Sequence, residues 1–573
     1  MKLLELFKML SLIPSNTEKL RGLILELAIQ GKLTQKWRDE NPNLEPAAEL
    51  LSRVKFKKQE LVSEKKIKPE KPSEIINDED KPFKTPLTWR WSRLQDLALI
   101  NGGFAFKSSN YKDKGARVIR ISDFNESGFK DDRIVRHPFT EDLSSFVLEK
   151  NNILIAMTGG TVGKSLFVES VPEIMVVNQR VATIKIVNEI NEAYINCVIP
   201  CNHIQNLIEE AKNSTNDNIS MGDIKAFLIP TPPVEEQKAI VETVKELLHE
   251  VEQLEALSQQ RIKLKENFVE SALGKLTSSE DTSQEWNYLT PHLKTFFTEK
   301  KSVKSLRETI LQLAVQGKLT KKWREENPNV EPASELIERI KKEKQQLIKE
   351  KKSKKEKLLP SIEASEIPYE IPISWEWERL NNVTKLITKG SSPKWQGIQY
   401  VNESDGGVLF ITSENVGNYN LILKKKKFVE VKFNDIEPRS ILRKNDILMN
   451  IVGGSIGRTA IYNLEEIANI NQAVTIIRLV DNQDHNYFLH FFNSPVCKSY
   501  MYDKQVDNAR PNLSMGNIAK FVIPIPPLEE QKAIVEKVNS LMALCDELEK
   551  QIINSEKQIE QLMKSCLKEA LEI

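Results

Sequence analysis

The chain has 573 residues, 82 Lys+Arg against 81 Asp+Glu, a formal net charge of +1 and 40% hydrophobic residues. This globular composition excludes an intrinsically disordered chain, a collagen-like fibre and a disulfide-stabilised scaffold. The near-neutral charge neither predicts nor excludes nucleic-acid binding, so contact with an acidic polymer has to come from local placement of charge.

The scattered cysteines are typical of reduced cytosolic thiols. Cys197, Cys201 and His203 form a CxxxCxH cluster without a nearby fourth ligand, so we interpret them as packing residues and predict no metal site. Glu5 and Lys8 interrupt the apolar core that a signal peptide needs, and no later run approaches the ~18 apolar residues of a membrane span. The chain is therefore expected to be cytoplasmic, with no membrane partner.

The first predicted elements are helical. Residues 20–33 form an amphipathic segment, and a charged stretch over 53–66 follows a polar connector. A longer charged stretch occupies 339–357, and we interpret both stretches as solvated helical surface. Linkers rich in Pro, Glu and Ser then lead to Trp89 and Trp375, where folded modules are expected to begin.

An internal repeat organises the chain. Residues 25–50 return as 311–336 with 20 of 26 positions identical, at an offset of 286. Residues 229–242 return as 523–536 with 12 of 14 identical, at an offset of 294, so the intervening segment is eight residues longer in the second copy (294 − 286). The chain is a duplication in which similar framework flanks divergent modules.

Each module contains short β-type runs separated by Gly, Asn and Asp, among them RVIRIS, NILIAMTG and VATIKI in the first copy. The spacing predicts an α+β module with a strongly bent sheet, ending in a short helix around 194–212 or 487–503. A duplicated enzyme would keep its catalytic residues in both copies. A duplicated reader of two targets would keep its frame and vary its reading surface.

Helices with a heptad pattern follow the modules. The apolar positions are Ile240, Val244, Leu247, Val251 and Leu254, and, at offset 294, Ile534, Val538, Leu541, Cys545 and Leu548. The matching registers predict that the two helices pair as a coiled coil, and a ~40-residue helix would span about 60 Å. In the alternative, each seam packs only on its own module.

Two candidate catalytic motifs are rejected. The segment 158–165 differs from a phosphate-binding loop at Thr158, and the residues after Ser165 are strand-like where such a loop needs a helix, so we predict a hairpin tip. Asn-Pro-Asn at Asn41 and Asn327 is interpreted as a turn. No catalytic set is visible, and we predict no catalytic residue in this chain.

Several motifs together resemble a known family. They are the duplicated AIQGKLT and AVQGKLT, the Trp-x-Trp-x-x-Leu module starts, and the PxPPxxEQ module ends at 230–237 and 524–531. With the alternation of conserved and divergent regions, the chain is similar to specificity (S) subunits of type I restriction-modification systems over nearly its whole length. The long charged segment between frame and module departs from compact members.

The resemblance implies a non-catalytic DNA reader. Each divergent module would be a target recognition domain that binds one half of an asymmetric bipartite site in double-stranded DNA. The conserved helices would space the modules and dock two methyltransferase (modification) subunits, and restriction/motor subunits would join them. The chain itself would hold no cofactor. S-adenosylmethionine for adenine methylation, and ATP and Mg for the ATP-dependent endonuclease, would bind the partner subunits.

The expected fold class is α+β, with two pseudo-repeated α/β target recognition domains separated and joined by long conserved helices that pair as a coiled coil. The expected divisions are 1–80 (N-terminal helical region and charged linker), 81–235 (target recognition domain 1), 236–277 (central spacer helix), 278–368 (second helical region and charged linker), 369–529 (target recognition domain 2) and 530–573 (C-terminal spacer helix).

Candidate DNA contacts follow from the chemistry of readout, because Arg and Lys suit guanine, Asn and Gln suit adenine, and Lys, Ser, Thr and backbone N–H groups suit phosphate. In the first module they are Lys107, Ser108, Arg120, Ser122, Thr158, Gly160, Thr161, Lys164, Asn178, Gln179 and Arg180. In the second they are Ser391, Ser392, Lys394, Trp395, Thr412, Asn415, Ser455, Arg458, Asn471, Gln472, Arg510 and Asn512. A surface or turn-stabilising role is the alternative for each.

The Asn-Gln pair present in both modules is interpreted as structural, since a shared residue cannot explain different targets. Divergent positions, such as Arg120 against Phe410, are expected to determine specificity. Two other functions stay open. One is a stand-alone sequence-specific or architectural DNA-binding protein, and the other is an enzyme acting on nucleotides through the Gly-rich hairpin.

Overall fold

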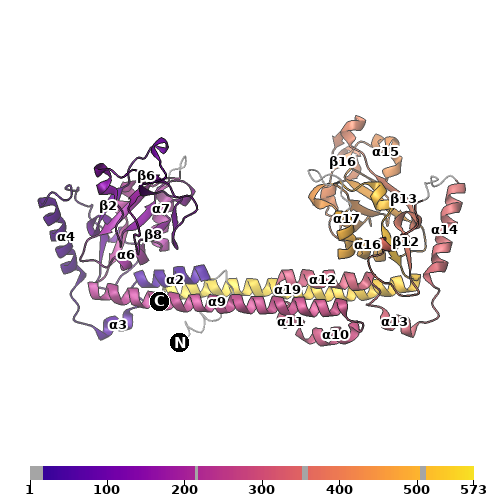
Figure 1. The fold of residues 1–573 in the computed structure, drawn as a ribbon, viewed down its shortest axis with the longest axis horizontal. Coiled ribbons are helices and arrows are strands. Elements are labelled where there is room, and N and C mark those ends of the chain that lie inside the picture. The colour runs from indigo at the N-terminus through magenta and orange to yellow at the C-terminus, as the bar shows by residue number, and fades with distance from the viewer. Residues whose placement is uncertain (1–16, 213–216, 351–358, 504–511, 573) are drawn as a thin grey trace. The chain divides into compact units, whose positions relative to one another are not determined.

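The computed structural model describes residues 17–212, 217–350, 359–503 and 512–572, with the backbone alone for 566–572. The chain divides into two compact units, and each has its own sheets and helices (Figure 1). Unit 1 consists of Met1–Ile262 and Gln558–Ile573, and unit 2 consists of Lys263–Lys557.

Unit 1 begins with the helices α2 (Thr17–Ile29), α3 (Gln35–Glu40) and α4 (Ala47–Ser63). The predicted amphipathic helix is confirmed, because α2 buries Leu20, Ile24 and Leu27. It ends before Gly31, whose φ of 71° is a left-handed conformation that favours glycine. The helix lies along α9 (Val234–Ser278), to which Arg21 is joined by an ion pair with Glu252 (3.4 Å; Figure 1).

The recognition domain of unit 1 contains a four-stranded antiparallel sheet of order β2-β10-β7-β8 and a three-stranded sheet of order β6-β3-β9, in which β3 and β9 are parallel. Its elements are α5 (Leu94–Leu97), β2 (Ala98–Gly102), β3 (Ala116–Ile119), β4 (Phe124–Asn125), β5 (Gly128–Phe129), β6 (Arg136–His137), β7 (Ile153–Ala156), β8 (Ser165–Phe167), β9 (Met175–Val177), β10 (Val181–Ile186), α6 (Glu192–Val198), α7 (Asn202–Ala211) and α8 (Met221–Ala226). The predicted β-type runs are all strands.

Unit 2 repeats the four-stranded sheet, with order β13-β20-β17-β18. Its second sheet has one further strand, with order β14-β16-β15-β19, and the pair β15–β19 is again parallel. Its frame helices are α10 (Thr282–Leu289), α11 (Leu293–Phe296), α12 (Lys300–Val315), α13 (Lys321–Glu326) and α14 (Ala333–Lys349). Its recognition domain contains β13 (Thr384–Lys389), β14 (Tyr400–Val401), β15 (Val408–Ile411), β16 (Phe428–Val429), α15 (Lys432–Ile436), β17 (Ile447–Asn450), β18 (Thr459–Ile461), β19 (Ala468–Ile470), β20 (Val474–Leu479), α16 (His485–Asn493), α17 (Pro495–Asp503) and α18 (Met515–Ala519).

The single short helix predicted at the end of each module is wrong in detail, because each module has two helices there. In unit 1, α6 and α7 are separated at Pro200, and in unit 2 α17 begins at Pro495, directly after α16. Proline has no backbone N–H to donate and its ring clashes with the preceding turn, so it interrupts a helix and suits a first helical position.

The first and last strands of each recognition domain pair with each other. Strand β1 (Arg90–Arg93) is antiparallel to β11 (Leu228–Thr231), and β12 (Glu376–Arg379) is antiparallel to β21 (Val522–Ile525). The long helices α9 and α19 (Leu528–Glu572) begin just after these last strands, as the proline-rich module ends predict. The chain therefore enters and leaves each recognition domain through two neighbouring strands.

The two long helices pack together within each unit. In unit 1, Val244 and Val251 of α9 share a buried core with Met563 of α19. In unit 2, one core contains Val269, Leu273 and Leu276 of α9 and Ile534, Val538, Leu541, Cys545, Leu548 and Ile552 of α19. The pairing of the two helices is confirmed, but the two predicted heptads do not pair with each other, because that of α9 belongs to the core of unit 1 and that of α19 to the core of unit 2. Both cores also include residues of the adjoining recognition domain, so the seam packs on its own module as well.

A buried carboxylate joins the repeated motifs in unit 1. Glu236 is the acid directly before the glutamine of the PxPPxxEQ motif, and it has no exposed surface. It accepts hydrogen bonds from the indole Nε1 of Trp89 (2.8 Å) and from the hydroxyl of Thr34 (2.8 Å). Arg38 completes the site through an ion pair with the same carboxylate, and its Nη2 donates to the carbonyl of Gly31 (2.8 Å). One acid therefore connects α9 to the GKLT segment and to the Trp-x-Trp motif.

The same arrangement is present in unit 2, where Glu530 accepts from Trp375 (2.8 Å) and Thr320 (2.7 Å) and pairs with Arg324. We call these two sites the frame clamps. The glutamine after the acid is hydrogen-bonded as well. The Gln531 amide nitrogen donates to the Pro526 carbonyl, and the amide oxygen accepts from the backbone N–H of Asp484. The repeated residues are therefore explained by the fastening of each module to its frame.

A buried histidine in unit 2 gives the fold a pH dependence. His490 of α16 is 4% exposed, its Nδ1 lies 3.3 Å from the Tyr419 hydroxyl, and burial lowers its pKa to about 4. Because the unfolded chain binds this proton near pH 6.5 and the folded chain does not, stability is lost as the pH falls below 6.5. From pH 7.5 to 5 this loss is expected to be about 2 kcal/mol.

The variant His490→Gln is expected to lack this part of the acid destabilisation, which denaturant unfolding at pH 7.5 and 5 measures. The matched control is His249→Gln on the exposed surface of α9, which retains the buried His490 and should lose stability between the two pH values as the wild type does. Equal losses of stability in the wild type and in His490→Gln would contradict the assignment.

Candidate nucleic-acid interface

In unit 1, the candidate residues lie on loops that meet at the turn between β9 and β10. Asn178 of this turn donates its backbone N–H to Ile119 at the end of β3 (2.9 Å), and Gln179 donates to Phe104 after β2 (2.9 Å). The Arg180 carbonyl accepts from Met157, at the start of the β7–β8 hairpin tip (2.9 Å). The loops after β2, β3 and β7 are therefore adjacent, although they come from distant parts of the sequence.

Unit 2 has the equivalent set of loops. Asn471 donates its backbone N–H to Ile411 at the end of β15 (3.0 Å), and Ile451 at the β17–β18 tip donates to Ala473 (3.0 Å). The loop after β13 joins through Gly390, which donates to Val474 (3.3 Å) as Gly103 does to Val181 in unit 1 (3.3 Å). We call the four loops of each recognition domain its reading loops.

The hairpin tips are built on glycine. Gly159 and Gly163 have φ values of 72° and 84°, and Gly453 and Gly457 have 68° and 84°. The chain continues into β8 and β18 rather than into a helix, which confirms the predicted hairpin and removes the structural basis of a phosphate-binding loop. Lys164, the cation of the first tip, is exposed.

The candidate residues differ in exposure. Exposed are Lys107, Ser108, Ser122, Gly160, Lys164, Gln179, Arg180, Lys394, Trp395, Arg458, Gln472 and Asn512. Partly exposed are Arg120, Thr158, Thr161, Asn178, Ser391, Ser392, Ser455 and Asn471. Thr412 and Asn415 are buried. Arg510 lies outside the described residues.

The shared asparagines stabilise the turns, as their presence in both copies suggests. The side-chain oxygen of Asn178 accepts from the backbone N–H of Arg180 (3.2 Å), and that of Asn471 accepts from Ala473 (3.1 Å). The glutamines that follow, Gln179 and Gln472, are exposed on the outside of the same turns.

The pairing of Arg120 with Phe410 as equivalent divergent positions is wrong. Ile119 and Ile411 are the equivalent strand ends, so Arg120 corresponds to Thr412. Phe410 is fully buried two residues earlier and cannot face a ligand in this conformation. The error arises because the two modules share only scattered sequence similarity, which does not align their residues one by one. The strand registers of the structure provide that alignment.

The corrected pair shows how the same turn is built from different chemistry. The Asp123 carboxylate accepts from the Arg120 backbone N–H (3.0 Å) and from its guanidinium (2.7 Å). The side-chain hydrogen bond raises the pKa of Arg120. In unit 2, Asn415 accepts from both the backbone N–H (3.0 Å) and the hydroxyl (2.9 Å) of Thr412. Thr412 and Asn415 therefore support the turn, whereas Arg120 stays partly exposed at its surface.

Neither a metal-binding cluster nor a membrane-spanning helix is present among the residues that the structure describes. Within them, no group of three or more His, Cys, Asp or Glu side chains is placed to hold a metal ion. Two members of the CxxxCxH cluster bond backbone carbonyls instead: the Cys201 thiol donates to the Cys197 carbonyl (3.1 Å), and the His203 ring nitrogen Nε2 bonds the Leu228 carbonyl (3.0 Å). None of the described helices has a stretch long and apolar enough to cross a bilayer.

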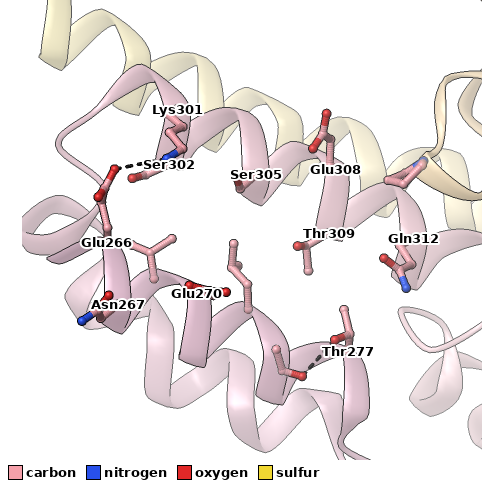
Figure 2. A pocket seen from close by; sticks show the side chains of 14 residues that line it. Glu266, Asn267, Glu270, Thr277, Lys301, Ser302, Ser305, Glu308, Thr309 and Gln312 are labelled. Carbon is pink, nitrogen blue, oxygen red and sulfur yellow. Dashed lines mark hydrogen bonds and ion pairs between the residues drawn. The ribbon is translucent and has the colours of Figure 1, made fainter. Parts of the chain in front are cut away.

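A groove of about 600 Å³ lies outside the reading loops, between the end of α9 and α12 in unit 2 (Figure 2). Its rim carries the ion pair Lys301–Glu266 (3.3 Å), and Glu270 and Glu308 add further acidic charge. The described residues that line it include no histidine or cysteine. Its lining comes from the frame helices α9 and α12, with Pro495 of α17 as the contribution of the recognition domain.

Comparisons with known proteins agree with this duplicated architecture. The family "Type I restriction modification DNA specificity domain" matches residues 86–264 and 372–558. The type I restriction enzyme EcoEI specificity subunit of Escherichia coli is 30% identical over 93% of this chain and 90% of its own length, and the EcoAI specificity subunit of the same species is 29% identical over 96% and 93%.

A solved structure described as "Structural basis underlying complex assembly and conformational transition of the type I R-M system" includes a chain of the same fold. The TM-score is 0.52 at 17% identity, covering 86% of this chain and 99% of that chain. The two matched segments each include one recognition domain and the beginning of the long helix that follows it. This chain therefore belongs to the type I restriction-modification DNA specificity family, as a specificity subunit with two recognition domains.

Proposed function

We propose that this chain is the non-catalytic subunit that gives a type I restriction-modification complex its DNA sequence specificity. Each recognition domain reads one half of an asymmetric bipartite site. The observation that carries the proposal is that the two domains share the order of their main sheet and their frame clamps, yet differ in what equivalent reading loops expose, as at the partly exposed Arg120 and its buried counterpart Thr412. Different loops on one scaffold suit two different half-sites.

The exposed cations of the reading loops suit a nucleic-acid partner. Lys164 and Arg458 occupy equivalent hairpin tips, and Arg180 lies at the turn where the loops of unit 1 meet. Lysine and arginine on exposed loops can neutralise phosphates and position the duplex, and they can read guanine where they reach a base edge. The net charge of +1 makes this local placement necessary.

The long helices α9 and α19 serve in this proposal as spacer between the two half-sites and as docking surface for two methyltransferase subunits. Both helices contribute apolar residues to the core of each unit. The groove in Figure 2 belongs to this frame and offers an acidic rim to a partner. S-adenosylmethionine, ATP and Mg would be bound by the methyltransferase and restriction/motor subunits.

The test is methylome sequencing of cells that carry this chain together with its neighbouring methyltransferase gene. We expect N6-methyladenine in one bipartite motif with two different half-sites, and its loss when the gene for this chain is deleted. A stand-alone DNA-binding protein would instead bind DNA without producing a methylated motif. Absence of a bipartite motif in expressing cells would refute the proposed function.

A further inference from the structure

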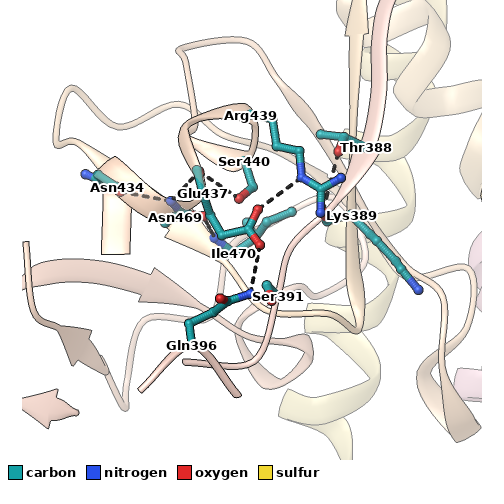
Figure 3. Close-up of polar contacts among 10 residues, drawn as sticks. All are labelled: Thr388, Lys389, Ser391, Gln396, Asn434, Glu437, Arg439, Ser440, Asn469 and Ile470. Atoms are coloured by element: carbon teal, nitrogen blue, oxygen red, sulfur yellow. Dashed lines mark hydrogen bonds and ion pairs between the residues drawn. The ribbon is translucent and has the colours of Figure 1, made fainter. Parts of the chain in front are cut away.

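A polar network unique to the second recognition domain supports one of its reading loops. The carboxylate of Glu437 accepts hydrogen bonds from Arg439 Nε (3.0 Å) and Gln396 Nε2 (3.3 Å), which reach it from opposite sides (Figure 3). Gln396 Nε2 also donates to the Ser391 hydroxyl (3.1 Å). Glu437 therefore holds two side chains in place, those of Arg439 and Gln396. Gln396 belongs to the loop after β13.

The acid is buried, whereas the groups that it holds reach the surface. Glu437 is 7% exposed, the Arg439 side chain is 59% exposed, and Gln396 is partly exposed. The two Nη groups of Arg439 and the Oε1 of Gln396 have no bonding partner among the residues that the structure describes. The network thus leaves a pair of donors and a separate acceptor available to a ligand.

A second layer holds the acid in place. Asn469 of β19 is fully buried, and its amide donates to the Asn434 side chain (2.8 Å) and to the backbone carbonyl of Glu437 (3.3 Å). The side-chain oxygen of Asn469 accepts from the backbone N–H of Ile470 (2.9 Å). Because both ends of the Asn469 amide are bonded, the turn that carries Glu437 is fixed to the central parallel strand pair.

The first recognition domain has apolar residues at the same places. Asn469 pairs with Phe410 as Val176 pairs with Val118 in the equivalent parallel strands. Leu143, the counterpart of Glu437, is fully buried in a core with Val118 and Val176. This equivalence follows from the next leucines, Leu148 and Leu442, whose backbone N–H groups donate to the equivalent carbonyls of Met175 and Ala468.

The comparison separates function from folding. The same scaffold forms around an apolar cluster in unit 1, so the polar network is not needed to build the domain. Burying a carboxylate costs desolvation free energy that an apolar core avoids. A costly feature present in one copy alone can also explain a difference between the two targets, which shared residues such as Asn178 and Asn471 cannot.

We propose that Glu437 is a positioning residue that holds Arg439 and Gln396 against base edges in the half-site of the second recognition domain. Arg439, with Nε fixed and both Nη groups available, suits the O6 and N7 acceptors of guanine. Gln396, with its amide nitrogen engaged, offers only its oxygen and so accepts from the amino group of adenine or cytosine. This inference rests on the proposed function and names the specificity residues of one half-site.

The experiment uses the full chain with its methyltransferase partner and reads the methylome of cells carrying each variant. Arg439→Ala is expected to relax discrimination about tenfold at one base pair of the half-site read by the second domain. Glu437→Leu, which imitates the first domain, should relax the same base pair, and Gln396→Ala a neighbouring one. The other half-site should stay unchanged in all three.

The matched control is Glu465→Gln, which removes an exposed acid that pairs with Lys444 in the same domain and should leave every base preference intact. Arg439→Lys keeps a positive charge beside the buried Glu437 carboxylate but lacks the guanidinium fork, so it keeps the test open if Glu437→Leu or Arg439→Ala does not fold. Methylation that weakens uniformly over all sequences, or an intact motif in Arg439→Ala, overturns the inference. A wild type without a bipartite motif instead overturns the proposed function.

Discussion

Replacing Glu530 with leucine is expected to lower the free energy of unfolding of unit 2 by about 3–5 kcal/mol, because it leaves a partly buried cation without its counter-charge and two buried donors without their acceptor. The acid is fully buried and receives hydrogen bonds from Trp375 and Thr320 besides its ion pair with Arg324. Leucine removes the shared acceptor of all three groups. Trp375→Phe, which removes a single donor, should cost about 1–2 kcal/mol.

Hydrogen exchange distinguishes this local effect from general destabilisation. Protection should fall in β12 and β21, next to the altered frame clamp, and should persist in β1 and β11 of unit 1. The matched control is Glu529→Leu, one residue earlier on α19, whose ion pair with Lys532 is exposed and contributes little. Equal stabilities for Glu529→Leu and Glu530→Leu would contradict the role assigned to the buried acid.

Exchanging residues 92–228 for the corresponding segment of another specificity subunit is expected to replace one half of the methylated motif and leave the other half unaltered. The exchange points lie on strands that pair with each other, since Ser92 is opposite Ile229 and Arg93 is opposite Leu228. The new segment therefore begins and ends at neighbouring positions. The frame clamp of unit 1, built from residues outside the segment, is retained.

The reciprocal control exchanges residues 378–522, which begin and end at the equivalent strand positions in β12 and β21. It should change the opposite half-site, and methylome sequencing reads both results directly. A change of both half-sites by either exchange would show that the recognition domains do not act as separate readers.

The sequence predicted the features that depend on local patterns. Short β-type runs separated by Gly, Asn and Asp predicted β7, β10, β17 and β20, and the Gly-rich segments predicted the hairpin tips. The heptads predicted the buried seam of α19, because apolar residues spaced by three and four along a helix share one face. The repeat predicted the duplicated topology, since similar sequences adopt similar folds.

The sequence did not predict contacts between residues far apart in the chain. The frame clamps join Thr34 to Glu236 and Thr320 to Glu530, so their motifs were recognised as repeated without a physical reason. Glu437 was not singled out because its partner Gln396 lies in another loop. The candidates Thr412 and Asn415 were selected for residue type, whereas strand register turns both inward.

The discontinuity of unit 1 has a consequence for biosynthesis. Val244 and Val251 of α9 share their core with Met563, which belongs to the segment Gln558–Ile573, while the rest of the unit ends at Ile262. At roughly 5–20 residues per second, a ribosome needs on the order of 15–60 s to add the residues between these two parts. During that interval the apolar face of α9 lacks its covering helix, so the nascent chain carries an open hydrophobic surface until translation of α19 is nearly finished.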